Sequence, residues 1–134
     1  MKQTKEQLKN ILGNVNTIAI VGASSNTNRD SFKVMKYLIN EGYDVIPVNP
    51  NETNNKILGK KCFQNLKSIK RKLDMVDIFR AKKYVNSITQ DAIEIEVKVI
   101  WTQEGITDEE SSILAKKAGI IFVMDECPKK ILEN

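Results

Sequence analysis

The stretch Thr17–Asp30, TIAIVGASSNTNRD, decides the fold and opens with a short run of apolar residues. The run ends at Gly22, and small polar residues follow it as far as Arg29. A continuous apolar run of this length is typical of a strand that is buried on both faces of a sheet. A helical pattern then begins at Ser31 and stops at Gly42. The stretch therefore predicts a strand, a loop and a helix, in that order.

Four further apolar runs repeat this arrangement along the chain. The five predicted strands are Thr17–Gly22, Asp44–Val48, Met75–Phe79, Val97–Thr102 and Ile120–Met124. The predicted helices are Ser31–Glu41, Tyr84–Glu96 and Asp108–Ala118, and helical spacing also marks residues 1–12. Strands that alternate with helices form parallel sheets covered on both faces. The sequence therefore predicts an α/β fold, a Rossmann-like doubly wound sheet of five parallel strands with an extra N-terminal helix.

The length of 134 residues predicts a single domain, residues 1–134, with its core at about residues 17–128. Residues 49–69 lack a helical pattern and predict a linker in place of a regular crossover helix. The N-terminus has no apolar run of the kind that signal peptides carry, and no stretch approaches the roughly 20 apolar residues of a membrane-spanning helix. We therefore expect a cytoplasmic protein without a membrane partner.

The chain contains no histidine, which excludes Ser-His-Asp and Cys-His catalysis and every His-ligated metal site. Its two cysteines, Cys62 and Cys127, form neither a CxxC pair nor a four-cysteine zinc site. We therefore expect no catalytic residue and no metal. Cys127 could serve as a nucleophile, but the two acids before it oppose thiolate formation, which favours a buried structural cysteine.

Positive charge is concentrated in one segment. Between Lys56 and Lys83 the chain has ten basic residues and two acidic ones, a charge of +8 in a protein whose net charge is +4. Such a segment either forms an ordinary solvated surface or produces a positive electrostatic field that attracts a polyanion. No aromatic residues interleave with the basic ones as they do in single-strand binders, so nucleic acid is not predicted. A small phosphorylated ligand stays an open alternative for this segment.

Ligands of open parallel sheets bind beyond the carboxyl ends of the strands, where the strand order reverses. Residues that follow the predicted strands are therefore candidates for binding. Gly22 lets the backbone approach a ligand closely, and the helix after it offers unpaired N–H groups to an anion. Arg29 and Arg80 supply planar guanidinium groups that suit phosphate. Gln103, directly after the fourth strand, is placed to shape the same pocket.

The loop after the first strand departs from both common nucleotide-binding motifs. Only Gly22 remains of the three glycines in GxGxxG, and no Gly-Lys-Ser/Thr follows as a P-loop requires. Sheets that bind NAD also place an acid at the end of the second strand to hold the ribose hydroxyls. Here that strand ends in Pro47-Val48-Asn49-Pro50. The missing acid argues against NAD and agrees with a ribose that carries a phosphate.

Four blocks of the sequence resemble the CoA-binding domain family. They are IAIVGASSNTNRDSFKVMKYLINEGYDVIPVNPN (18–51), VDIFR (76–80), VIWTQEGI (99–106) and VMDECP (123–128). The chain is similar to the small stand-alone members of this family and to the N-terminal domain of the succinyl-CoA synthetase α subunit. The synthetase subunit also has a second domain with a phosphorylated histidine, which this chain lacks, so the resemblance does not imply ligase activity.

The resemblance implies that coenzyme A or an acyl-CoA is the ligand. The residues that it places around the ligand are Gly22, Ala23, Ser24 and Arg29 at the pyrophosphate, with Ser25 in the same loop, Val48, Asn49 and Pro50 at the adenosine, Phe79 and Arg80 at the ribose phosphate, and Trp101, Gln103 and Gly105 along the rest of the pocket. CoA carries about four negative charges near pH 7, which suits the basic segment.

Three functions stay open at this point. The first is a protein that binds CoA or an acyl-CoA without catalysis of its own, with a mixed disulfide between CoA and Cys127 as a variant. The second is an NAD(P)-dependent oxidoreductase. The third is an interaction module that regulates a protein partner and keeps only a vestigial pocket. Homodimers are common among soluble proteins, so a homodimer is also considered.

Overall fold

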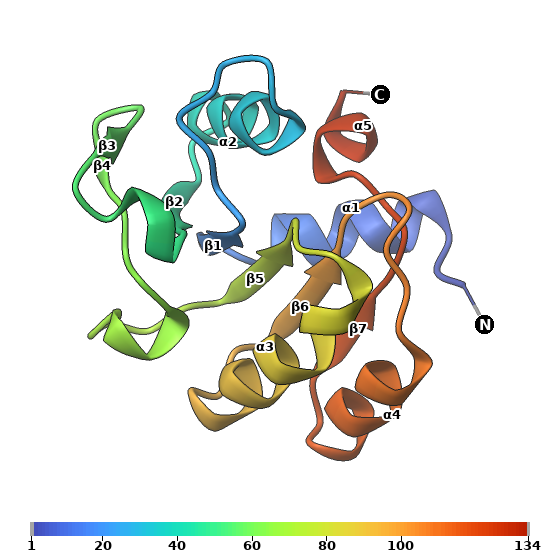
Figure 1. Cartoon of the computed structure of the whole chain (residues 1–134). Coiled ribbons are helices and arrows are strands. Elements are labelled where there is room, and N and C mark those ends of the chain that lie inside the picture. The colour runs from blue at the N-terminus through green and yellow to red at the C-terminus, as the bar shows by residue number, and fades with distance from the viewer. Residues whose placement is uncertain (1, 134) are drawn as a thin grey trace.

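The computed structural model describes residues 2–133, and its centre is a sheet of five parallel strands (Figure 1). The strands, in spatial order, are β2 (Asp44–Val48), β1 (Thr17–Val21), β5 (Met75–Ile78), β6 (Val99–Thr102) and β7 (Ile121–Val123). Helices cover both faces: α1 (Lys5–Gly13), α2 (Asp30–Asn40) and α5 (Pro128–Leu132) on one, and α3 (Lys82–Glu94) and α4 (Glu109–Lys117) on the other. The predicted Rossmann-like, doubly wound α/β fold is confirmed.

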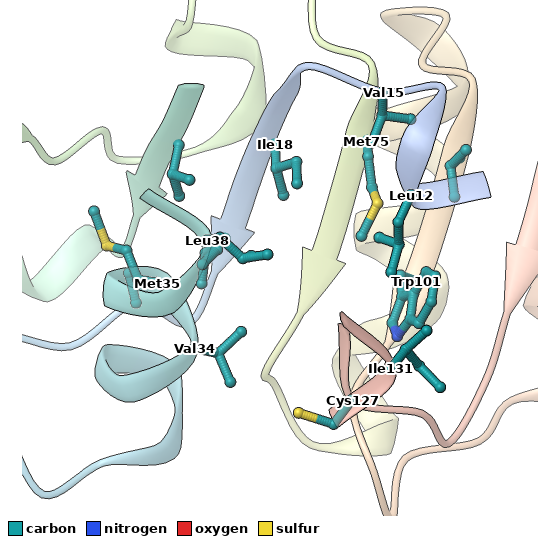
Figure 2. Close-up of a cluster of buried hydrophobic side chains, with 14 of the residues drawn as sticks. Leu12, Val15, Ile18, Val34, Met35, Leu38, Met75, Trp101, Cys127 and Ile131 are labelled. Atoms are coloured by element: carbon teal, nitrogen blue, oxygen red, sulfur yellow. The ribbon is translucent and has the colours of Figure 1, made fainter. Parts of the chain in front are cut away.

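The strand side chains alternate between two hydrophobic cores. Ile18 and Ile20 of β1 pack with Leu38 of α2, whereas Ala19 of the same strand packs with Val85 of α3. Successive residues of a strand point to opposite faces, so a strand covered on both sides must be apolar at every position. This explains why the strands are continuous apolar runs in the sequence. Figure 2 shows the core beneath α1, α2 and α5.

The structure contains short elements that the sequence did not predict. Residues 49–69 form no α-helix, as expected, but they include the 3-10 helices η1 (Pro50–Glu52) and η2 (Leu66–Ser68) and a hairpin of β3 (Lys56–Ile57) with β4 (Lys60–Lys61). The helix α5 lies just beyond the predicted core. Elements of two to five residues are too short to show a period in the sequence. Met1, the first residue of the predicted N-terminal helix, and Asn134 lie outside the described residues.

The strand order reverses at β1, and this reversal positions the site. From β1 the chain passes to β2 on one side of it, and then crosses to β5 on the other side. The main-chain register pairs Val21 with Val48 of β2 and with Ile78 of β5. The segments that leave these three strands therefore begin at the same edge of the sheet. This edge is where ligands of open α/β sheets bind.

Asp77 is a fully buried carboxyl group in β5, paired in the sheet register with Ile20 and Trp101. Neither of its carboxyl oxygens has a hydrogen-bond partner among residues 2–133. Burial raises the pKa of Asp77 well above its usual range. The folded protein therefore keeps this proton at pH values at which the unfolded chain has already lost it.

The raised pKa of Asp77 predicts a stability that decreases as the pH rises. The contribution of Asp77 to the free energy of unfolding is fully present below the pKa of about 4 that its carboxyl has in the unfolded chain. As the pH rises further, this contribution is lost by up to roughly 1.4 kcal/mol per pH unit, until the pH reaches the pKa of Asp77 in the folded protein. Asp77→Asn should remove this slope and make the protein more stable than the parent at neutral pH. Urea unfolding at a series of pH values measures the effect. A variant with the parent's pH profile would contradict it.

Asp74→Asn provides a control with the opposite sign. Burial raises the pKa of the Asp74 carboxyl, but the N–H groups of Asn16 and Thr17 and the ammonium of Lys98 outweigh it and lower the pKa overall. The folded state therefore favours the ionised form of Asp74, and its contribution is lost as the pH falls. This variant should be less stable than the parent at neutral pH, in the same unfolding experiment.

Candidate functional site

A cavity of about 660 Å³ opens at the edge of the sheet where the strand order reverses. We call it the main cavity, and its size is typical of small-molecule sites. The loop after β1, the start of α2 and the segments after β2, β5 and β6 all contribute to it. The lining residues are Gly22, Ala23, Ser24, Asn28, Arg29, Asp30, Ser31, Asn49, Asn51, Glu52, Phe79, Arg80, Gln103, Glu104 and Ile106.

Most of the residues predicted from the sequence lie at the main cavity or beside it. Eight of them line it: Gly22, Ala23, Ser24, Arg29, Asn49, Phe79, Arg80 and Gln103. Val48 and Pro50 line a second cavity of about 180 Å³, which shares Gly22 and Arg80 with the first. We call this second one the side cavity. Its other lining residues are Val21, Gln64, Asn65, Leu66, Tyr84, Ser87, Ile88 and Asp91.

Three of the predicted residues line neither cavity. Ser25 is exposed, and its backbone N–H donates to the carboxylate of Glu52 at 2.9 Å. Trp101 is fully buried in the core shown in Figure 2, where its indole N–H donates to the carbonyl oxygen of Glu126 at 2.8 Å. The backbone N–H of Gly105 donates to Oδ1 of Asp125 at 2.6 Å. Trp101 and Gly105 therefore connect β6 and the loop after it to the segment that follows β7.

Gly22 brings the loop after β1 against the turn after β5. Its φ is +94°, a conformation that residues with a side chain avoid. A Cβ atom at this position would lie 2.9 Å from the carbonyl oxygen of Phe79 and 3.2 Å from Cδ of Arg80. The guanidinium carbon of Arg80 lies 4.1 Å from the centre of the Tyr84 ring, in a cation–π contact. The missing side chain of Gly22 thus leaves room for Arg80 between the two cavities.

The loop after β1 holds its shape through its own side chains. The hydroxyl of Ser24 accepts the N–H of Asn26 at 3.0 Å, and Oδ1 of Asn26 accepts the N–H of Asn28 at 2.9 Å. The backbone N–H groups of Ser24 and Thr27 have no partner in the described part of the chain. Unpaired N–H groups next to a helix N-terminus are suited to an anion.

Glu52 is a carboxylate that sequence reasoning missed. The second strand ends in Pro47-Val48-Asn49-Pro50 without an acid, as noted from the sequence, but Glu52, four residues beyond β2, lines the main cavity. A carboxylate therefore lies beyond the end of β2, and the expectation against NAD stays a prediction. The turn at Pro50–Glu52 brings the side chain back to the end of the strand. In the irregular segment 49–69 the pair Asn49-Pro50 indicates a turn, but not where the side chain of Glu52 lies.

Of the ten basic residues in the basic segment, only Arg80 lines the main cavity. Other members of the segment pair with acids elsewhere, such as Lys67 with Glu94 at 2.7 Å and Arg71 with Asp44. The lining includes three carboxylates, which belong to Asp30, Glu52 and Glu104, against the guanidinium groups of Arg29 and Arg80. Glu104 forms an ion pair with Lys130 at 2.9 Å. The positive charge at the site therefore comes from two individual arginines.

Gln103 lines the main cavity and has a buried, unsatisfied hydrogen-bond acceptor. Its backbone N–H donates to the carbonyl oxygen of Ile78 at 3.1 Å, which fixes it directly beyond β6. The residue is 8% exposed, and its side-chain Oε1 has no partner within residues 2–133. A buried acceptor without a partner is costly, and a ligand that donates an N–H would remove that cost.

Both cysteines are buried, and Cys127 packs in the core shown in Figure 2. Burial raises the pKa of the Cys62 thiol. Within residues 2–133, no group of three His, Cys, Asp or Glu side chains is arranged to hold a metal ion. The same residues contain no helix with the length and apolar character needed to cross a membrane.

Comparison with known proteins identifies the family. Residues 16–133 match the sequence model of the CoA binding domain. The chain belongs to the CoA-binding domain family. The uncharacterized protein YneT of Bacillus subtilis (strain 168) is 35% identical to it over 126 residues, which are 94% of this chain and 92% of that protein.

Solved structures of similar proteins have the same fold. A hypothetical protein from Pyrococcus horikoshii OT3 superposes with a TM-score of 0.92 and 38% identity, over 98% of this chain and 91% of that one. Acetyl-coenzyme A synthetase 1 of Ca. Korarchaeum cryptofilum, in complex with phosphate and ADP, superposes with a TM-score of 0.70 and 24% identity. That match covers 83% of this chain and 26% of the synthetase, and at this identity it shows a shared fold only.

Proposed function

We propose that the chain binds coenzyme A or an acyl-CoA across the two cavities, without catalysis of its own. The observation that carries this proposal is the position of Arg80, which lies beside Gly22 and lines both cavities at the edge where the strand order reverses. A single guanidinium there is able to contact a phosphate while the rest of a nucleotide extends to either side. Membership of the CoA-binding domain family supports CoA as the nucleotide.

The phosphates of CoA are assigned to two positions. The pyrophosphate lies against the unpaired N–H group of Ser24, with Arg29 as a counter-charge. The ribose phosphate lies against Arg80, whose guanidinium is held over Tyr84. Both arginines line the main cavity, so a ligand with phosphates at its two sides satisfies both.

The two ends of CoA are assigned to opposite sides of Arg80. The adenosine occupies the side cavity, where Val48, Pro50 and Leu66 offer apolar contacts. The pantetheine arm extends through the main cavity toward Gln103 and Ile106. This arm contains amide N–H groups, and the unpaired Oε1 of Gln103 is a suitable acceptor for one of them.

A nicotinamide dinucleotide is the second candidate, and Glu52 is the observation that favours it. A carboxylate beyond the second strand of a Rossmann-type sheet accepts hydrogen bonds from the ribose hydroxyls of NAD. Glu52 lines the main cavity from that side. Against this candidate, the loop after β1 contains one glycine of the GxGxxG motif, Gly22.

Thermal unfolding with a series of ligands tests the proposed function. The series is CoA, acetyl-CoA, dephospho-CoA, NAD, NADP and ATP. CoA at about one hundred times its dissociation constant should add roughly 2.7 kcal/mol of stability and raise the melting temperature by several degrees. Dephospho-CoA, which lacks the ribose phosphate, should give a smaller shift. A shift with NADP but none with CoA would favour the oxidoreductase, and no shift with any ligand would favour the interaction module.

A further inference from the structure

Glu52 places a carboxylate on the loop that we propose to bind the pyrophosphate. Its Oε2 accepts a hydrogen bond from the backbone N–H of Ser25 at 2.9 Å. The neighbouring N–H groups of Ser24 and Thr27 have no partner among the described residues. A carboxylate and a phosphate oxygen are both strong acceptors for backbone N–H groups. The chain therefore supplies its own anion to the middle of this loop.

Other contacts keep Glu52 in this position. The side chain of Asn49 donates from Nδ2 to the carbonyl oxygen of Ala23 at 2.8 Å, so the segment after β2 is tied to the loop after β1. Oδ1 of Asn49 accepts the N–H of Asn51 at 2.9 Å, which begins the short helix η1. Glu52 is the last residue of that helix and is half-buried. The carboxylate thus reaches Ser25 from a segment that is itself anchored to the loop.

We infer that Glu52 determines specificity by competing with the ligand for the N–H of Ser25. The inference rests on the proposed function, since it assigns the pyrophosphate of CoA to this loop. A small anion that replaces Glu52 exchanges one charge-assisted hydrogen bond for another and gains little. A pyrophosphate also reaches the free N–H group of Ser24 and the guanidinium of Arg29, which both line the main cavity, so it displaces the carboxylate. The loop thereby rejects small anions and admits the nucleotide.

Glu52→Gln tests this competition, with Glu104→Gln as the matched control. Both substitutions remove one negative charge from the lining of the main cavity, but Glu104 pairs with Lys130 instead of the loop. Glu52→Gln should tighten CoA binding by about tenfold and Glu104→Gln by less than about threefold, as measured by calorimetric titration. Inorganic phosphate should compete with CoA in the Glu52→Gln variant and not in the parent.

Two results of the titration would overturn the inference. If Glu52→Gln weakens CoA binding, the carboxylate holds the ligand, as it would hold a ribose hydroxyl, and does not compete with it. If Glu52→Gln and Glu104→Gln change the affinity by the same factor, the effect is one of net charge in the cavity, and the contact with Ser25 has no separate role.

Hydrogen exchange of the Ser25 amide tests the contact without any ligand. Glu52→Ala should accelerate this exchange and leave the amide of Asn28 unchanged, because Asn28 is bonded to Asn26. Equal exchange of the Ser25 amide in the variant and the parent would overturn the inference even if CoA binds. A protected Ser25 amide in a parent protein that fails to bind CoA would instead overturn the proposed function.

Discussion

Gly22→Ala is expected to destabilise the protein by about 3 kcal/mol and to lower its melting temperature by roughly 10 °C. Part of the cost is the positive φ of +94°. The rest comes from the new Cβ, which would lie 2.9 Å from the carbonyl oxygen of Phe79, so that the turn after β5 must shift. Arg80 moves with this turn, and we expect the affinity for CoA to fall by at least about tenfold. Thermal unfolding and calorimetric titration measure the two effects.

Gly42→Ala separates the backbone cost from the contact with Phe79. Gly42 has a φ of +98°, nearly that of Gly22, but a Cβ there would meet no atom within 4 Å. Its replacement should cost only about 1 kcal/mol and leave CoA binding unchanged. If the two alanine variants lose the same stability and both bind CoA like the parent, the close approach of the two loops at Gly22 does not matter for the site.

Arg80→Ala is expected to weaken CoA binding by about thirtyfold to one hundredfold, which corresponds to roughly 2–3 kcal/mol. Arg80 lines both cavities, so its removal leaves the ribose phosphate without the charge that we assign to it. The affinity for dephospho-CoA, which lacks that phosphate, should fall much less. Calorimetric titration of both ligands against the parent and the variant measures the difference.

Lys83→Ala is the matched control for Arg80→Ala. The ammonium of Lys83 lies 5.1 Å from the centre of the same Tyr84 ring that Arg80 covers, but Lys83 lines neither cavity. Its removal changes the net charge by the same amount and should alter the affinity for CoA by less than about threefold. An equal loss in both variants would mean that only the net charge of this surface matters.

The sheet could be predicted from the sequence because burial on both faces leaves a clear pattern. Each of the residues Thr17–Val21 is buried, and the side chains of residues 18–21 divide between the two cores. Once the strands were predicted, their carboxyl ends were known as well, and Gly22 and Arg80 could be predicted as binding residues because they follow two of these ends. The hairpin of β3 with β4 and the helix α5 could not be predicted, because they are held by contacts with the rest of the fold and not by a period of their own.

Trp101 and Glu52 show where sequence reasoning reached its limit. The resemblance placed Trp101 along the pocket, but this residue is buried because it precedes the end of β6 at Thr102, within the covered part of the strand. Gln103, the first residue beyond that end, reaches the main cavity. Glu52 was missed because its position depends on the turn that begins at Pro50, and the side chain of Asn49 stabilises this turn through the N–H of Asn51. Such a local hydrogen bond leaves no periodic signal in a sequence.

A titration of the protein with CoA, followed by the chemical shifts of the backbone amides, tests the central claim most directly. We expect CoA to shift the amides of Gly22–Arg29, of Phe79 and Arg80 and of Gln103, which surround the proposed binding site. The amides of the opposite edge of the sheet, such as Asp44, should stay unchanged. An absence of shifts at saturating CoA, or shifts confined to residues outside the two cavities, would contradict the proposal that this site binds CoA.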